Sequence, residues 1–265
     1  MTGEPSDAVA DGDNVRMLVD AWTLMVGRLP TSTLQRAHGV ASVFGHVPLS
    51  FLNVSILDRP LTDPAAFRGA VETARTRAGT CRHSSLVALC TAWAPQGWAE
   101  MAAAAGLKPM LNMTGMAADA LLPARRPAPA AELRLITDVG AASDLASVNA
   151  VAYGMKVEEF DCIANLHLWR ERSFGVVAYA DGRAAAAAAT FVIGDRTYVA
   201  FVATLPDARG QGLAEAAIRR AVELAEAEAG PKRLWLHASD MGRPLYESMG
   251  FNAGASLPLL QFAAG

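Results

Sequence analysis

The sequence predicts an α/β protein, with the α+β character of a central mixed, mostly antiparallel sheet flanked by helices, and it predicts two such halves in tandem. Short apolar segments typical of strands alternate with segments of helical spacing through most of the 265 residues. Two turns of aspartate and glycine join the three strands of a predicted antiparallel meander in the second half. A proline-rich segment lies between the halves.

That segment, residues 121–132, reads LLPARRPAPAAE. Its three prolines exclude a continuous helix or a central strand, so we interpret it as a linker. Residues 1–13 are acidic and small, and we expect a disordered tail there. The predicted domains are therefore 14–120 and 133–265.

The second half is predicted to follow the order β-α-α-β-β-β-α-β-α-β. Its elements are a strand at 133–136, helices at 143–155 and 158–171, strands at 174–180, 183–193 and 197–205, a helix at 215–228, a strand at 233–238, a helix at 243–249 and a strand at 257–262. Ser143 and Asp144 are available as helix caps. The run Ala184–Ala189 favours a helix by propensity, but the turns at Asp181-Gly182 and Gly194-Asp195 favour a strand.

The first half is predicted to follow the order β-α-β-α-β, as residues 197–262 do. Its elements are a strand at 49–57, a helix at 63–76 that opens with Asp-Pro, a strand at 84–90, a helix at 96–105 and a strand at 108–113.

Composition argues against several classes of protein. The net charge of −3 and the absence of a basic stripe argue against nucleic-acid binding. We see no apolar run long enough for a membrane span and no secretory signal, so we expect a cytoplasmic protein. Cys81, Cys90 and Cys162 are expected to be reduced structural thiols, and the scattered histidines and cysteines predict no metal site.

The segment 206–214, Pro-Asp-Ala-Arg-Gly-Gln-Gly-Leu-Ala, joins a predicted strand to a predicted helix. Glycines let backbone N–H groups approach a ligand closely, and the positive end of the following helix points at the same place. The segment therefore suits an anion such as a pyrophosphate. Taken alone, Gly210 and Gly212 fit an ordinary tight turn equally well.

Two motifs make the second half, from about Leu133 onward, resemble the GNAT superfamily of N-acetyltransferases. The pyrophosphate loop of that family has the form Q/R-x-x-G-x-G/A, and Arg209, Gly212 and Ala214 occupy its specified positions. About thirty residues later, the segment 245–251, LYESMGF, is similar to the family's LYExxGF motif. The resemblance implies a GNAT fold and acetyl-CoA as the cofactor.

By the same resemblance, the cofactor-binding residues are the loop positions and backbone groups of the strand before them. They are Val202, Ala203, Thr204, Arg209, Gly210, Gln211, Gly212, Leu213 and Ala214. Ser239 occupies a position where the family often has asparagine, and it retains a hydroxyl that can donate a hydrogen bond.

The tyrosine of the second motif, Tyr246, is implied as the general acid that protonates the leaving CoA thiolate. A phenol with a pKa of about 10 is reasonably matched to a thiol. Many family members also have a glutamate on the strand before the loop, but residues 197–205 contain no acidic side chain. The base therefore stays open among Glu158, Glu159, Asp161, His167, His237, Asp240 and a water-mediated route.

The first half lacks both motifs, since Arg59–Pro64 stands in place of the glycine loop and Ala102 in place of Tyr246. We interpret it as a degenerate GNAT-like half, although unrelated α/β domains also have the order β-α-β-α-β. It would cover an exposed sheet edge and wall the acceptor pocket.

The function that this implies is acetyl-CoA-dependent acetylation of a primary amine on a small molecule, an amino acid or a peptide N-terminus, by direct transfer. Two alternatives stay open: a non-catalytic acyl-CoA-binding module, and a protein-modifying acetyltransferase. Neither the acceptor, the acyl chain length nor the oligomeric state follows from the sequence.

Overall fold

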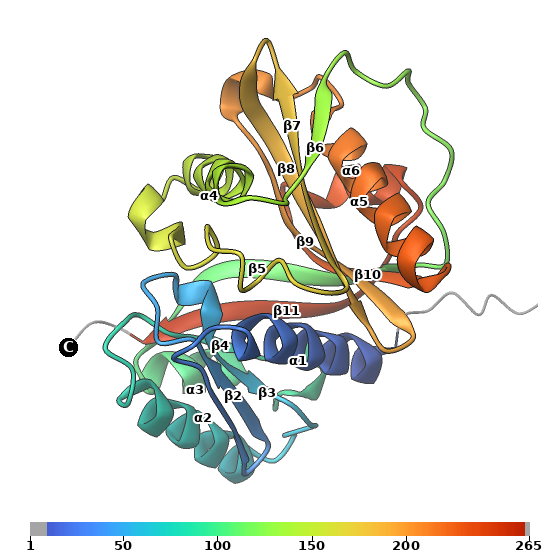
Figure 1. Ribbon diagram of the computed structural model, residues 1–265. Helices are drawn as coiled ribbons and strands as arrows, with labels where there is room; N and C mark the ends of the chain where they lie inside the picture. Colours follow the sequence, from blue (N-terminus) through green and yellow to red (C-terminus); the bar gives the residue numbers. More distant parts are fainter. Residues whose placement is uncertain (1–9, 263–265) are drawn as a thin grey trace, which may run out of the picture. The chain divides into compact units, whose positions relative to one another are not determined.

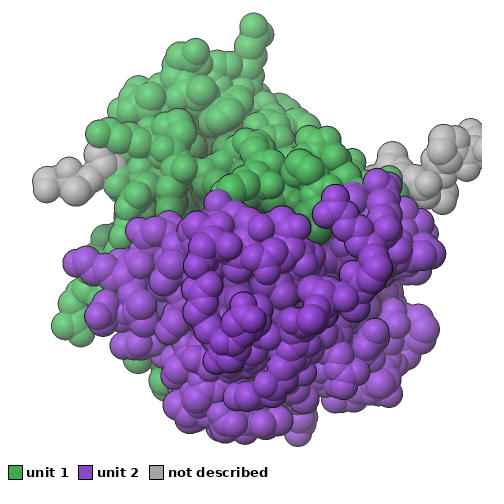
Figure 2. Space-filling view, turned by 90° about the horizontal axis from the view of Figure 1, so that it is seen from above, with its two compact units in different colours: residues 1–117, 237–247, 251–265 green, residues 118–236, 248–250 purple. Residues whose placement is uncertain are grey.

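The computed structural model describes residues 10–262 (Figure 1). It divides into two compact units that do not follow the chain in sequence, as the colours of Figure 2 show. Unit 1 contains the residues up to 117, then 237–247, and those from 251 onward, whereas unit 2 contains 118–236 and 248–250. The predicted division into 14–120 and 133–265 differs from this one because the chain returns to unit 1 near its C-terminal end.

Unit 1 is built on a sheet whose strand order is β1-β2-β3-β4-β11-β5. The strands are β1 (Thr33–Ala37), β2 (Val40–Phe44), β3 (Asn53–Leu57), β4 (Leu86–Ala88), β11 (Asn252–Phe262) and β5 (Leu107–Ala118). Neighbours are antiparallel except β3 and β4, which are parallel. The late strand β11 therefore separates two strands of the first half, which residue patterns did not predict.

Helices cover both faces of the central strands of this sheet, whereas β1 is largely exposed. Helices α2 (Pro64–Ala78) and α3 (Trp98–Ala104) cover one face, with Phe67 at the centre of their apolar cluster. Helix α1 (Asp11–Gly27) packs against β1, β2 and β11 and covers the other face. We expected a tail for residues 1–13, but α1 begins at Asp11, and residues 1–9 lie outside the described part. Apolar residues at helical spacing, such as Val15, Leu18 and Trp22, are the signal for α1 that we missed.

Unit 2 has the strand order β10-β9-β8-β7-β6. The strands are β6 (Glu132–Leu135), β7 (Ser173–Ala180), β8 (Arg183–Ile193), β9 (Arg196–Thr204) and β10 (Arg233–Ser239), of which 237–239 belong to unit 1. The alanine run is strand, as predicted, and Ala186–Ala189 are completely buried in β8. Helices α4 (Val139–Tyr153) and α5 (Leu213–Ala229) both pack on β8, whose small side chains permit their close approach.

The predicted helix at 158–171 is wrong, because the chain forms only a short 3₁₀ turn at Val157–Phe160. The residues that follow bury Leu168 and Trp169 instead of continuing a helix. The Trp169 ring stacks on Phe191 at 6.0 Å, and its indole N–H donates to the carbonyl of Ile163. The predicted caps at Ser143 and Asp144 are also wrong, since the carboxylate of Asp138 caps α4.

Other elements of the first half are shorter than predicted. The segment 49–57 becomes a strand only at Asn53, after a 3₁₀ turn at Ser50–Leu52, and the strand predicted at 84–90 covers only Leu86–Ala88. The helix that opens with Asp63-Pro64 is confirmed, because the Asp63 carboxylate accepts hydrogen bonds from the N–H groups of Ala65 and Ala66.

Gly115 of β5 should not tolerate a side chain. An added Cβ would lie 1.9 Å from Oδ1 of Asn14, which is completely buried on α1. We expect Gly115→Ala to lower the free energy of unfolding by about 1–3 kcal/mol. The matched control is Gly69→Ala on α2, where an added Cβ meets nothing within 4 Å. That variant should gain about 0.5–1 kcal/mol from better helix propensity. Urea unfolding measures both, and equal stability of the two variants would contradict this account.

Candidate functional site

The glycine loop lies in unit 2, between the end of β9 and the start of α5. A 3₁₀ turn at Pro206–Ala208 leads into it. Gly210 and Gly212 both have a φ of +78°, in the left-handed region that glycine adopts without steric cost. Gly212 is also the N-cap of α5 and provides no side-chain cap. The N–H groups of the first turn of α5 are therefore available to an external acceptor.

The space above these glycines is open. A Cβ added at Gly210 would meet nothing within 4 Å, and one at Gly212 would meet only Cδ of Pro129, at 4.0 Å. Packing against the protein therefore does not demand glycine at either position. The left-handed backbone demands it, and the open space admits a ligand to the backbone N–H groups. These features fit a pyrophosphate held by Gly210, Gln211, Gly212, Leu213 and Ala214.

The charges around the loop also suit an anion. Of the nearby carboxylates, Asp207 forms a 2.8 Å ion pair with Arg183, and Glu215 forms a 2.7 Å ion pair with Arg219. The hydrogen bond from Arg183 lowers the pKa of Asp207, so this carboxylate stays ionised and paired. Arg209 is exposed and has no ion pair within residues 10–262. Its positive charge therefore remains available at the loop.

Strand β9 changes its pairing before it reaches the loop. Its register with β10 runs from Arg196↔Arg233 to Tyr198↔Trp235, whereas β9 continues to Thr204. On the β8 side the register shifts between Ala187 and Ala189, which marks a bulge in β9. Phe201 sits in this bulge with a φ of +51°, which is unusual for a bulky residue. The predicted backbone contributors Val202, Ala203 and Thr204 follow directly.

A buried amide holds this bulge in place. Asn149 of α4 is almost completely buried, and its Nδ2 donates to the carbonyls of Leu145 at 2.9 Å and Phe201 at 3.2 Å. The Tyr153 hydroxyl lies 3.5 Å from the carbonyl oxygen of Val202. We did not predict either residue from the sequence. An asparagine inside an apolar helix is the only signal, and its partner is far away in the chain.

The other predicted residues, Tyr246 and Ser239, belong to unit 1. Tyr246 lies on α6 (Arg243–Ser248), is 8% exposed, and meets the ring of Phe251 edge-on at 5.9 Å. Its carbonyl accepts a hydrogen bond from the N–H of Phe251. Oγ of Ser239 accepts from the N–H of Gly242 at 3.3 Å and so shapes the turn before α6. The loop and β9 thus belong to unit 2, whereas Ser239 and Tyr246 belong to unit 1.

The candidate bases differ in how they are engaged. Burial lowers the pKa of His237 to about 4, which makes its imidazole a weak base near neutral pH. Oε1 of Glu159 accepts from the backbone N–H of Lys156 at 3.4 Å, and His167 contacts Arg170 at 2.6 Å. Oδ1 of Asp240 accepts from the amide of Asn112 at 3.3 Å. Glu158 and Asp161 are exposed. None of these positions has a geometry that identifies it as the base.

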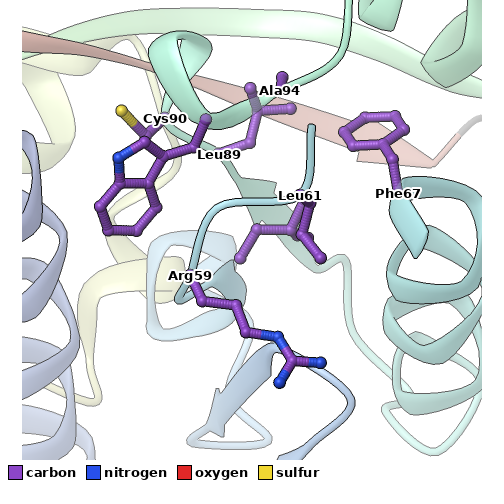
Figure 3. A pocket seen from close by; sticks show the side chains of 8 residues that line it. Arg59, Leu61, Phe67, Leu89, Cys90 and Ala94 are labelled. Atoms are coloured by element: carbon purple, nitrogen blue, oxygen red, sulfur yellow. The ribbon is translucent and has the colours of Figure 1, made fainter. Parts of the chain in front are cut away.

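Unit 1 has a different arrangement at the position that corresponds to the glycine loop. There the N–H groups at the start of α2 already bind the carboxylate of Asp63. A small apolar recess lies beside it (Figure 3), lined by Leu57, Arg59, Leu61, Phe67, Leu89, Cys90, Trp93 and Ala94. The Arg59 side chain turns away from Leu61 in this view and packs over Gly39. In unit 1 the N–H groups at the start of α2 are thus already bound to a carboxylate, whereas those at the start of α5 in unit 2 have no side-chain cap.

Three further observations bear on the predicted chemistry. Residues 10–262 contain no group of three or more histidine, cysteine, aspartate or glutamate side chains placed to hold a metal ion. Cys81, Cys90 and Cys162 are free thiols, and burial raises the pKa of Cys162 to about 12. No helix in the described part is long and apolar enough to cross a membrane.

Comparison with known proteins identifies a GNAT domain within the chain. Residues 147–251 match the model of the acetyltransferase (GNAT) family. No curated protein is significantly similar to the chain. The match at residues 147–251 confirms the GNAT resemblance predicted from the two motifs.

Solved structures share the fold over nearly the whole chain. A GCN5-related N-acetyltransferase from Kribbella flavida is 20% identical, with a TM-score of 0.68 over 96% of this chain and 97% of the other. One from Sphaerobacter thermophilus is 13% identical, with a TM-score of 0.55 over 96% and 94%. A tandem GNAT protein from the clavulanic acid biosynthesis pathway is 14% identical, with a TM-score of 0.51 over 97% and 98%. The predicted fold class is confirmed.

The buried amide of Asn149 yields a test of the bulge. Asn149→Ala removes the donor to the Phe201 carbonyl, leaves that oxygen unsatisfied and should lower the free energy of unfolding by about 1–3 kcal/mol. Asn165→Ala is the matched control, because the residue is half-buried and both hydrogen bonds of its amide are local: Nδ2 donates to the carbonyl of Cys162, and Oδ1 accepts from the N–H of His167. Asn165→Ala should lower the free energy of unfolding by less than Asn149→Ala does. Thermal unfolding of both variants measures the difference, and an equal loss would contradict a special role for Asn149.

Proposed function

We propose that this chain, whose residues 147–251 form a GNAT acetyltransferase domain, transfers the acetyl group of acetyl-CoA directly to a primary amine on a small molecule, an amino acid or a peptide N-terminus. GNAT acetyltransferases use acetyl-CoA, and the chain is an acyltransferase of this class. The observation that carries the proposal is the pair of left-handed glycines at the N-terminus of α5, under open space.

The loop and β9 divide the task of holding the cofactor. Backbone N–H groups of Gly210 to Ala214 suit the pyrophosphate, and the positive end of α5 adds a favourable field. Backbone groups of Val202, Ala203 and Thr204 lie on β9 beyond Tyr198, the last residue whose pairing with β10 is described above, so they suit the amides of the pantetheine arm. The bound cofactor supplies an acetyl thioester, whose carbonyl carbon is the electrophile.

Tyr246 is proposed as the general acid for the departing thiolate, and Ser239 as a nearby hydrogen-bond donor. The support for Tyr246 is its place in the LYESMGF motif and its burial beside Phe251. The amine must be neutral when it attacks, and β9 contains no carboxylate that would accept its proton. We therefore propose that the proton leaves through water, since no candidate side chain is arranged as a base.

The glycine loop predicts the effect of an added charge. Gly212→Asp places a branched side chain and a negative charge at a backbone position with a φ of +78°, so acetyl-CoA binding should be lost. The matched control is Gly194→Asp, at the left-handed turn between β8 and β9, where an added Cβ meets nothing within 4 Å. Calorimetric titration should show unchanged binding for the control. Unchanged binding of acetyl-CoA by Gly212→Asp would show that the loop is not part of the cofactor site.

The acid role of Tyr246 predicts a loss of turnover without a loss of binding. General acid catalysis contributes about 10²–10⁴-fold, so Tyr246→Phe should reduce kcat about a hundredfold or more with the KM for acetyl-CoA unchanged. The control is Tyr179→Phe, since Tyr179 is 9% exposed and its hydroxyl donates to Asp144. Release of free CoA across a panel of primary amines measures the rate. Unchanged turnover of Tyr246→Phe with a good acceptor would disprove the role.

The absence of a carboxylate on β9 favours one alternative, a module that binds acyl-CoA without catalysis. Calorimetry with acetyl-CoA, followed by the same amine panel, separates the two functions. One binding site per chain with acceptor-dependent release supports the acetyltransferase. Tight binding without release on any amine supports the module.

A further inference from the structure

The linker that joins β5 to β6 is held against α5 at one end. The N–H of Leu122 donates to the carbonyl of Met249 at 2.9 Å, and the carbonyl of Leu122 accepts from Nη2 of Arg219 at 2.8 Å. Asp119 forms a 3.3 Å ion pair with Arg233. All these residues belong to unit 2. The linker is therefore attached to the flank of the helix that follows the glycine loop.

The other end of the linker reaches the glycine loop itself. Cδ of Pro129 is the nearest atom to a Cβ added at Gly212, at 4.0 Å, and β6 begins at Glu132. Figure 1 shows the linker running beside α5. Pro123, Pro127 and Pro129 restrict the backbone between the two anchors, because proline fixes φ and favours extended conformations. Arg125 and Arg126 thus lie on a stiff segment that spans from α5 to the loop.

These two arginines differ from most others in unit 2. Arg134, Arg183, Arg196, Arg219, Arg220 and Arg233 each form an ion pair with a carboxylate. Arg125 and Arg126 are exposed, and neither has a hydrogen bond or an ion pair within residues 10–262. The carboxylates at the loop, Asp207 and Glu215, are already neutralised by Arg183 and Arg219. The linker therefore carries two positive charges that no described carboxylate pairs with, three and four residues before Pro129, whose Cδ approaches the loop.

We infer that Arg125 and Arg126 bind the 3′-phosphate of CoA, an inference that rests on the proposed function. CoA carries two separate phosphate groups, the pyrophosphate and a monoester on the ribose. The N–H groups of the loop and the exposed Arg209 suit the pyrophosphate. The monoester, whose charge is about −1.5 to −2 near neutral pH, needs cations of its own. Guanidinium groups bind such a group with paired hydrogen bonds. The linker is thus a part of the cofactor site as well as a connection.

The test compares acetyl-CoA with acetyl-dephospho-CoA, which lacks only the 3′-phosphate. Calorimetry on the full chain should show that the wild type binds acetyl-CoA about tenfold or more tightly than the dephospho form. The double variant Arg125→Gln/Arg126→Gln should bind both with the weaker affinity. Its KM for acetyl-CoA should rise with kcat unchanged, because the phosphate is remote from the reacting thioester.

The matched control is Arg134→Gln/Arg220→Gln, which removes the same charge from unit 2 at two exposed, ion-paired positions. It should keep the preference for acetyl-CoA. A wild-type protein without this preference would overturn the inference, and so would a linker variant that keeps it. Binding of both cofactors with equal affinity leaves the proposed function intact, whereas binding of neither by the wild type overturns the function as well.

Discussion

The left-handed backbone at Gly210 and Gly212 is the constraint on which the cofactor site depends. It turns the chain from the end of β9 into the first turn of α5 within a few residues. Neither glycine is required by a neighbouring protein atom closer than 4.0 Å. The backbone conformation is therefore what requires glycine at both positions. A side chain at either position would strain the turn and would also occupy the space through which a ligand reaches the backbone N–H groups.

The two halves of the chain differ in the N-cap residue of the helix that follows the compared loops, and this residue determines whether the first N–H groups of the helix can bind a ligand. In unit 1 the carboxylate of Asp63 accepts hydrogen bonds from two N–H groups of α2. This cap stabilises the helix, and it occupies the end of the helix that would attract an anion. In unit 2 the equivalent helix begins after Gly212, which supplies no such acceptor. We propose on this basis that the first half is a degenerate GNAT-like half, in which an aspartate side chain caps the helix where a ligand would otherwise bind.

Most regular elements of the second half were predictable because their signals are local. The turns at Asp181-Gly182 and Gly194-Asp195 correctly identified an alanine run as strand β8. The helix expected at 158–171 failed because Trp169 is buried against Phe191 and Phe201, contacts that no local pattern reveals. The residues of the candidate site also differ in how local their sequence signals are. The loop was visible as a motif, whereas the bond from Asn149 to the carbonyl of Phe201 joins residues 52 positions apart.

The position of β11 between β4 and β5 has a consequence for the order in which the chain folds. Ribosomes release a protein from its N-terminus, so β4 and β5 emerge well before the residues 252–262 that pair with both of them. Until those residues arrive, the facing edges of β4 and β5 expose unpaired backbone groups, while all the strands of unit 2 have already been synthesised. Unit 1, which contains the N-terminal helix, is thus the unit that finishes folding later, and its nascent sheet is open to wrong pairing during synthesis.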